Sequence, residues 1–439
     1  MRRGDSTGRG DALSVVLAQS TLLLSSLAVQ ALLAWLLMPA GRGQYAVFAV
    51  LGALMPVLCS FGVDRSIQYQ LMSGRMTAGA AMGSMLVAAL ISALLGTGVG
   101  LLLAGRGPFP AFAAAPASWY AALVLIALTS GYTYLLRLLV ATRRFRQYLV
   151  VTIVQGAANV VLLVSLVGVL RLGTAGAVAA FALSYGVGAS LSLYWLRAAG
   201  DRMTIAPRAQ LPAIAGYAAQ YYPALLGHAI DFNAGTLVLA SIAASSEVGL
   251  YAAISALMLR FLLFAQALQE TVLPRVAADS IGRPALVAQM SRISMAGTAL
   301  IAVAFCLVSK PVLSLLLSPA FARAAVLAWW IAPGLILHAA STLLMPYFEG
   351  TNRPGAVSIA TWIGLLGNIM SIVGFYPLLG LQGAALALSI GMSLRFAVLA
   401  WLFCRSTRTP LKDITFARPA DVRLLKRALP LWRPGIRGT

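Results

Sequence analysis

About a dozen long apolar stretches follow one another from Leu13 to Cys404, and they constrain the fold of this 439-residue chain more than any other feature. Hydrocarbon offers the peptide backbone no hydrogen-bonding partner, so a stretch of about 20 apolar residues in a bilayer must form an α-helix. Hydrophobic residues make up 60% of the chain, whereas a soluble domain contains roughly 45–50%. The sequence therefore predicts an all-α polytopic membrane protein.

We expect twelve membrane-spanning helices. The first is too long for a cleavable signal peptide and lacks a small-residue cleavage site, so we expect it to remain as a span. The expected helices are Leu13–Met38, Gln44–Val63, Thr77–Ala104, Trp119–Leu139, Tyr148–Leu170, Ala175–Leu196, Leu211–Ala243, Gly249–Leu273, Met290–Leu317, Ala324–Tyr347, Ala356–Leu379 and Gln382–Cys404.

Basic residues predict the orientation of these helices. Every connection on one side carries a cation, as in the run Arg143, Arg144 and Arg146, whereas the other side receives few. Cytoplasmic loops carry such an excess of Lys and Arg, so we expect both termini in the cytoplasm. The formal net charge is +21. Its placement in short loops and the tail favours contact with lipid headgroups over nucleic acid.

The chain contains an internal repeat. GQYAVFAVLGAL, starting at Gly43, matches GLYAAISALMLR, starting at Gly249, and RLGTAGAVAAF from Arg171 matches LLGLQGAALAL from Leu378. Both pairs have nearly the same separation, slightly over two hundred residues. Six helices per repeat would give both halves the same orientation, and the repeats would be related by an axis along the membrane normal.

The repeat predicts two parallel six-helix lobes around a central cleft. The expected lobes are residues 1–206 and 207–404, and residues 405–439 form a basic cytoplasmic tail. Rocking of one lobe against the other would give alternating access. In the tail, ADVRLLKRALPLW has the spacing of an amphipathic helix on the anionic inner leaflet; a solvated positive tail is the alternative.

Two ionisable residues lie deep inside neighbouring apolar stretches. Asp231 precedes and Arg260 follows a connection that we expect to be centred near residues 245–246, which places both about 15–20 Å from the outer turn. Either charge costs about 2.5–3.5 kcal/mol at the bilayer centre, so each is expected to face a partner or a polar cavity. Two interpretations stay open. An incoming anion could compete for Arg260 and release Asp231, or the two could form a static ion pair.

Other polar side chains follow helical spacing and are predicted to line a substrate-binding cavity. Gln19, Ser26 and Gln30 share one face of the first expected helix, and Tyr221, His228 and Asp231 share one face of the seventh. Hydrogen bonding between helices inside one lobe is the alternative for these side chains.

Four further charged residues have less specific expectations. Arg395 lies midway along the last expected helix. We expect it to be either a second contact for an anion or a hydrogen-bond donor to carbonyl groups. Glu270 and Arg275 lie near the inner end of the eighth expected helix and are gate candidates or an interfacial pair. Arg137 is expected to extend its charge from the end of the fourth expected helix to the interface.

No enzyme signature is present in the sequence. It contains no GxxxxGK[ST] loop for ATP, and no connection is long enough for a catalytic domain. The two histidines and the scattered Cys59, Cys306 and Cys404 lack metal-ligand spacing. We therefore expect neither an enzyme, a cofactor nor a metal site, and any energy source would be an ion gradient, the membrane potential or removal of the substrate.

Several segments, in this order, resemble the Wzx-type O-antigen flippases of the multidrug/oligosaccharidyl-lipid/polysaccharide (MOP) exporter superfamily. These segments are GQYAVFAV, FGVDRSIQYQL, LLVATRRFRQY, LGTAGAVAAFALS, EVGLYAAISALM, LPRVA and LGLQGAALALS. The resemblance extends from Ala12 to about Arg405 and implies a MATE-like fold in the inner membrane of a bacterium. It also implies transport of undecaprenyl-pyrophosphate-linked oligosaccharide to the outer leaflet for O-antigen, exopolysaccharide or capsule.

The resemblance also implies partners and leaves two alternatives. The implied partners are the lipid-linked oligosaccharide, membrane lipids, a proton or sodium ion for coupling, and polysaccharide polymerase and chain-length proteins. A cation-coupled multidrug exporter of the same superfamily is the first alternative, although such relatives typically use an acidic residue in their first helix and Leu13–Met38 has none. A membrane glycan polymerase is the second, and the short outward loops argue against it.

Overall fold

The computed structural model describes residues 5–106, 116–142, 144–198, 203–266, 268–269, 284–351, 353–416 and 418. Side chains are described in these ranges from Ser26 onward, except those of residues 103–106, 116 and 354. Expectations for other residues, including Glu270, Arg275 and the tail segment ADVRLLKRALPLW, lie outside this description.

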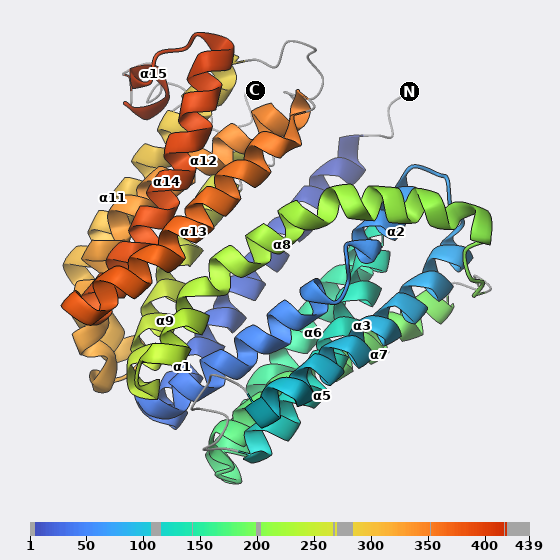
Figure 1. Cartoon of the computed structure of the whole chain (residues 1–439). Coiled ribbons are helices and arrows are strands. Elements are labelled where there is room, and N and C mark those ends of the chain that lie inside the picture. The colour runs from blue at the N-terminus through green and yellow to red at the C-terminus, as the bar shows by residue number, and fades with distance from the viewer. Residues whose placement is uncertain are drawn as a thin grey trace, which may run out of the picture. The chain divides into compact units, whose positions relative to one another are not determined.

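The described residues form thirteen α-helices and no strand (Figure 1). Three short segments accompany them: the π-helix η1 (Val164–Val169) and the 3-10 helices η2 (Arg208–Gln210) and η3 (Pro319–Ala324). The helices are α1 (Asp5–Leu58), α2 (Val63–Met72), α3 (Ala78–Arg106), α5 (Pro116–Ala141), α6 (Phe145–Leu163), α7 (Gly173–Ala198), α8 (Leu211–Ile242), α9 (Ser245–Arg260), α11 (Pro284–Leu316), α12 (Ala325–Gly350), α13 (Pro354–Leu379), α14 (Leu381–Thr407) and α15 (Lys412–Thr415).

The predicted all-α polytopic fold is confirmed. Among the described residues, 11 helices are long and apolar enough to cross a membrane. The first two of the twelve expected spans are joined in α1, whose backbone leaves the helical region at Met38 with φ 55° and ψ 175°. In Figure 1 the chain of α1 reverses its direction, so this break is the hairpin turn expected after Met38.

Helix α2 was not predicted from the sequence as a separate helix. This ten-residue helix lies in the connection that was expected to follow the second span, after a turn in which Gly62 adopts a left-handed conformation with φ 76°. Asp64, Ser66, Ile67 and Gln70 are buried on one side of α2, and Arg65 and Tyr69 are more accessible. Because its apolar stripe is short and interrupted by polar residues, α2 has no signal of membrane-spanning length.

The chain divides into two compact units. The first contains residues 1–253 and 311–323, and the second contains residues 254–310 and 324–439. This division differs from the expected lobes, because α8 packs against α1 and α2 inside the first unit. The expected lobes are defined by the repeat in the sequence, whereas the two units are defined by which residues pack together. The lobe boundary at residues 206–207 therefore stays a prediction.

Small residues line the helix contacts of the first unit. In its core, α5 packs against α3 and α7, and α7 also packs against α6. Ser130, Ser184 and Ser192 are fully buried and each donates a hydrogen bond to a carbonyl one turn earlier in its own helix. Small side chains let membrane helices approach closely, while large apolar side chains such as Leu94 and Leu102 are exposed, as expected of a surface that meets lipid.

The second unit has α14 packed between α12 and α13. Gly334 of α12 approaches α14 so closely that its backbone N–H donates to the Ser389 hydroxyl at 2.7 Å. The start of the expected tail also belongs to this unit. Arg292 of α11 donates to the carbonyl of Asp413 in α15, and the Ser291 hydroxyl donates to the carbonyl of Ile414 at 3.1 Å.

Candidate functional site

The structure places the predicted site residues in different surroundings. On α8, Asp231 is half-buried, whereas His228 and Tyr221 are exposed. Arg260 is exposed at the end of α9, and Arg395 on α14 is only 2% exposed. Gln19 lies in α1, among the residues whose side chains are not described. The role of each residue in binding substrate stays a prediction.

The α8–α9 connection lies earlier than expected. Helix α8 ends at Ile242 and α9 begins at Ser245, so the turn is Ala243–Ala244 rather than residues 245–246. Asp231 precedes the end of α8 by 11 residues and Arg260 follows the start of α9 by 15, or about 16 Å and 22 Å along the helices. The two residues are therefore not equidistant from the turn, and their equal depth in the membrane stays a prediction. Asp231 belongs to the first unit and Arg260 to the second, and their pairing stays a prediction.

Asp231 has a neighbour that was not predicted. Tyr251 of α9 is 2% exposed, and its side chain lies near Asp231. The Tyr251 hydroxyl packs against the backbone of Gly235 in α8, where an added Cβ would lie only 2.1 Å from it. His228 packs edge-on against Phe232, with ring centroids 4.8 Å apart.

Gln30 lies in a hydrogen-bonded contact between the two arms of α1. Arg42, which is 3% exposed, donates to the Gln30 carbonyl at 2.7 Å and also to its side-chain Oε1. The Arg42 guanidinium lies 5.5 Å from the ring centroid of Phe321 in η3, inside the first unit. Gln30 thus accepts hydrogen bonds from the buried Arg42 guanidinium. Arg42 in turn joins the two arms of α1 to η3.

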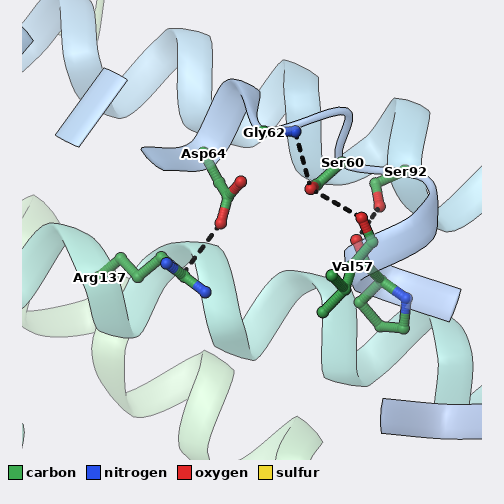
Figure 2. Close-up of polar contacts among 7 residues, drawn as sticks. Val57, Ser60, Gly62, Asp64, Ser92 and Arg137 are labelled. Atoms are coloured by element: carbon green, nitrogen blue, oxygen red, sulfur yellow. Dashed lines mark hydrogen bonds and ion pairs between the residues drawn. The ribbon is translucent and has the colours of Figure 1, made fainter. Parts of the chain in front are cut away.

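Asp64, Arg65 and Arg137 form what we call the α2–α5 charge cluster. Asp64 Oδ2 lies 3.1 Å from Arg137 Nε, and the side chains of Asp64 and Arg137 are 3% and 17% exposed. Figure 2 shows the Arg137 side chain extending from α5 to Asp64 at the start of α2. The structure gives Arg137 a partner that was not predicted, the buried carboxylate of Asp64, and its extension to the interface stays a prediction.

Hydrogen bonds in the α1–α2 turn position Asp64. The Ser60 hydroxyl donates to the carbonyl of Val57 at 3.0 Å and accepts from the backbone N–H of Gly62 at 3.1 Å (Figure 2). The Ser92 hydroxyl of α3 donates to the carbonyl of Pro56, which lost its usual helical partner near the end of α1. With the turn held in this way, the first residues of α2 direct the Asp64 carboxylate toward α5.

A second group, which we call the tyrosine row, joins α2 to α8. Tyr69 stacks on Tyr217 with ring centroids 4.4 Å apart and an interplanar angle of 8°, and Tyr217 lies 6.2 Å from Tyr221 at 12°. The Arg75 guanidinium lies 6.0 Å from the centroid of Tyr69. Tyr69 and Tyr221 are 39% and 37% exposed, so the row is a polar aromatic surface rather than part of the core.

Three hydrogen bonds strengthen this contact between α2, the end of α1 and α8. The Ser66 hydroxyl donates to the carbonyl of Ile214 at 2.8 Å, and the Tyr222 hydroxyl donates to the carbonyl of Leu58 at 2.7 Å. The side-chain amide of Gln210 donates to the carbonyl of Arg75 at 3.3 Å. The charge pattern predicts that this contact lies on the cytoplasmic side.

The two glycines that the sequence repeat makes equivalent touch each other. A Cβ on Gly43 would lie 1.7 Å from the carbonyl oxygen of Ser245, and one on Gly249 would lie 2.0 Å from that of Pro39. Either Cβ would also lie 2.9 Å from the other glycine's backbone nitrogen. Only glycine permits an approach this close, and the axis that would relate the two repeats stays a prediction.

The described residues contain no group of three or more His, Cys, Asp or Glu side chains that could hold a metal ion. Cys59, Cys306 and Cys404 are free, and the first two are buried. The chemistry of the described sites is therefore that of permanent cations, a carboxylate and phenols.

No protein-family model matches the sequence, and the comparison with curated proteins found no match. The fold, in contrast, is similar to solved membrane transporters. The lipid II flippase MurJ in an inward closed conformation has a TM-score of 0.74 and 12% identity, over 97% of this chain and 93% of that chain. An inward-facing multidrug resistance MATE family transporter of the MOP superfamily has a TM-score of 0.63 and 17% identity, over 89% and 96%.

The Vibrio cholerae MATE transporter VcmN in its bent form is also similar, with a TM-score of 0.57 and 15% identity, over 93% of this chain and 99% of that chain. These structural neighbours are described as two MATE transporters, one of them assigned to the MOP superfamily, and a lipid II flippase. Together with the apolar helices, they show that the chain is a multi-pass membrane protein with the MATE-like polytopic fold.

Proposed function

We propose that this protein moves an undecaprenyl-pyrophosphate-linked oligosaccharide from the cytoplasmic to the outer leaflet during the synthesis of a surface polysaccharide. One observation carries the proposal. Arg260, a permanent cation, is exposed inside a membrane-spanning stretch, Ser245–Gln266. Such a cation is costly against lipid and is suited to bind a pyrophosphate through charge-assisted hydrogen bonds.

The fold supports this proposal. The structural neighbour described as a lipid II flippase shares the fold over nearly the whole chain. Transport by alternating access between two repeats fits that fold. In the proposed cycle the pyrophosphate binds the exposed guanidinium of Arg260 through charge-assisted hydrogen bonds.

Complementation in the source bacterium tests the proposal. Deletion of the gene should stall glycan export, and the wild-type chain should restore surface polysaccharide. Arg260→Ala should fail to restore it, whereas Arg260→Lys should restore part of it because the positive charge is kept. Normal surface polysaccharide with Arg260→Ala, at wild-type protein levels in the membrane, would reject the role of Arg260.

A cation-coupled multidrug exporter is the second candidate, because MATE transporters share the fold. The absence of an acidic residue in Leu13–Met38 argues against it. Expression that changes tolerance to drugs or cationic dyes, with no change in glycan, would favour this candidate. A membrane glycan polymerase has no support among the structural neighbours described above.

A further inference from the structure

The α2–α5 charge cluster carries more positive than negative charge. Arg65 and Arg137 supply two permanent cations, and Asp64 supplies one carboxylate. The guanidinium of Arg137 interacts electrostatically with both Asp64 and Arg65. A lone carboxylate between two guanidinium groups leaves one positive charge uncompensated, which favours a second anion at this position.

The cluster also has unused hydrogen-bonding groups. Among the described residues, the buried Nε of Arg65 and Nη1 of Arg137 have no hydrogen-bond partner, and neither does Oδ1 of Asp64. Buried donors without partners are destabilising, so groups of this kind mark a place where something is bound. Two guanidinium groups with free N–H donors suit the oxygens of a phosphate, which accepts such bonds in pairs.

The two arginines of the cluster are partly exposed, and the cluster lies next to the tyrosine row. Arg65 and Arg137 are half-buried rather than sealed. Arg65 and Tyr69 lie about one helical turn apart on α2, and Tyr69 stacks on Tyr217 of α8 with ring centroids 4.4 Å apart. Phenol rings offer flat faces to the C–H groups of a sugar and hydroxyls to its O–H groups. A phosphate at the arginines would therefore place an attached sugar beside the tyrosines.

We propose that the α2–α5 charge cluster binds the phosphate of a lipid-linked sugar on the cytoplasmic side, with the sugar against Tyr217 and Tyr221. This inference rests on the proposed function and adds to it a first binding position distinct from Arg260. Asp64 holds Arg137 in place when no substrate is bound (Figure 2). The arriving phosphate then competes with Asp64 for the guanidinium.

Binding of geranyl pyrophosphate, a short water-soluble prenyl pyrophosphate, tests the site. The full chain is placed in phosphatidylcholine nanodiscs, and each variant is first checked by thermal melting. Arg65→Gln should weaken binding at least tenfold, and Asp64→Asn should strengthen it severalfold because the competing carboxylate is lost. Arg208→Gln is the matched control, since it removes an exposed cation in η2, and it should leave the affinity unchanged.

Loss of Arg137 by itself could impair folding, so a double variant keeps the test decisive. Asp64→Asn combined with Arg137→Gln removes both charges, keeps a polar side chain at each position and leaves no lone buried ion. It should fold and bind geranyl pyrophosphate at least tenfold more weakly than the wild type. Wild-type affinity in this double variant and in Arg65→Gln would overturn the proposal, as would weaker binding in Asp64→Asn.

A glycosylated probe tests the tyrosines. Tyr221→Ala should weaken binding of geranyl pyrophosphate that carries one N-acetylglucosamine, and it should leave binding of bare geranyl pyrophosphate unchanged. Equal effects on both probes, or no effect on either, would reject the sugar-binding role of the row.

Two further comparisons separate the possible sources of failure. If phosphatidylglycerol in the nanodiscs displaces geranyl pyrophosphate from the wild type but not from Arg65→Gln, the site takes a lipid headgroup, and the assignment to a sugar phosphate is wrong. If Arg65→Gln loses binding but the wild-type chain does not restore glycan export, the site stands and the proposed function fails. If the wild type restores export while Arg65→Gln and the double variant bind normally, the function stands and the site fails.

Discussion

The first unit joins its helices in two very different ways. At the start of α9, the contact with α1 is made by backbone on backbone at Gly43 and Gly249, with no room for even one methyl group. Where α2 meets α8, the contact depends on side chains: stacked tyrosines, hydroxyl groups and, beside them, arginines with unused donors. The charge pattern predicts that the first contact is on the outer side and the second on the cytoplasmic side.

The difference shows how one protein can combine a fixed crossing with an adaptable surface. A backbone contact has one geometry, because neither helix has a side chain that could rotate to fill a gap. Rings and hydroxyls on long side chains can be separated from one partner and paired with another. We therefore expect substitutions at the glycine crossing to affect folding most, and substitutions in the α2–α8 contact to have smaller, graded effects.

Gly249→Ala should produce the largest effect. The added Cβ would meet the Pro39 carbonyl at 2.0 Å, and a backbone group cannot move aside without separating α1 from α9. Overpacking of this kind costs about 3 kcal/mol or more. Gly131→Ala is the matched control, since nothing lies within 4 Å of its added Cβ.

The measurement is the thermal melting temperature of the purified protein in detergent, together with its yield in the membrane. Gly249→Ala should melt well below the wild type or fail to accumulate. Gly131→Ala should melt at or above the wild-type temperature, because alanine is about 1 kcal/mol better than glycine in a helix. Similar melting of the two variants would show that the crossing is not close-packed.

Arg137→Ala should have the next largest effect, because it leaves the Asp64 carboxylate buried without its partner. Breaking a buried pair in this way costs about 3–5 kcal/mol. Adding Asp64→Asn to Arg137→Ala should recover part of the loss, since the neutral amide is cheaper to bury. The check is a double-mutant cycle on unfolding midpoints, with exposed Arg146→Ala as a control that should change stability by less than about 0.5 kcal/mol.

A cycle in which the two substitutions add independently would contradict this interpretation of the ion pair. Independent effects would mean that Arg137 stabilises α5 only through its aliphatic stem, and the α2–α5 charge cluster would then lose its electrostatic basis.

The helices could be predicted from the sequence because apolar length is a local property. A stretch such as Phe145–Val169 satisfies its own backbone whatever surrounds it. The amphipathic α2 could not be predicted in this way, because it has no apolar stretch of membrane-spanning length. Its stability comes from packing on α5 and α8. The α8–α9 turn was misplaced by two residues, because alanine at Ala243–Ala244 marks no helix end.

Pairings between helices could not be predicted in the same way. Sequence comparison made Gly43 and Gly249 equivalent, but equivalence does not reveal that the two positions touch. Asp64 and Arg137 lie on different helices, and neither carries a local signal of the other. Gln30 was assigned to a cavity from its helical face, whereas its partner Arg42 lies on the returning arm of the same hairpin. Which side chains from different helices or arms become neighbours is decided by tertiary packing, and the local sequence around each residue does not reveal it.

Tyr222→Phe should have a moderate effect at the α2–α8 contact. It removes the hydroxyl that donates to the Leu58 carbonyl at 2.7 Å and keeps the ring that packs 5.7 Å from Phe61. Such a hydrogen bond in a membrane protein contributes about 0.6 kcal/mol on average and at most about 1.7 kcal/mol. Melting temperatures should show a modest decrease, while Tyr120→Phe, at a tyrosine that is 68% exposed, should melt like the wild type. Identical melting of the two variants would show that the Tyr222 bond contributes nothing.

Ser66→Ala should have the smallest effect, and it is also the sharpest test of whether α2 and α8 are held together locally. The lost bond to the Ile214 carbonyl is 2.8 Å long and joins two helices, and side-chain hydrogen bonds in membrane proteins contribute on average about 0.6 kcal/mol. Ser192→Ala is matched to it, since Ser192 is equally buried but bonds to Gly188 within its own helix. Amide hydrogen exchange in Val63–Met72 should become faster in Ser66→Ala than in Ser192→Ala, although the two melt at nearly the same temperature. Equal exchange in both variants would mean that the tyrosine row and the Asp64–Arg137 pair hold α2 in place. The hydrogen bond of the Ser66 hydroxyl would then not contribute to the stability of α2.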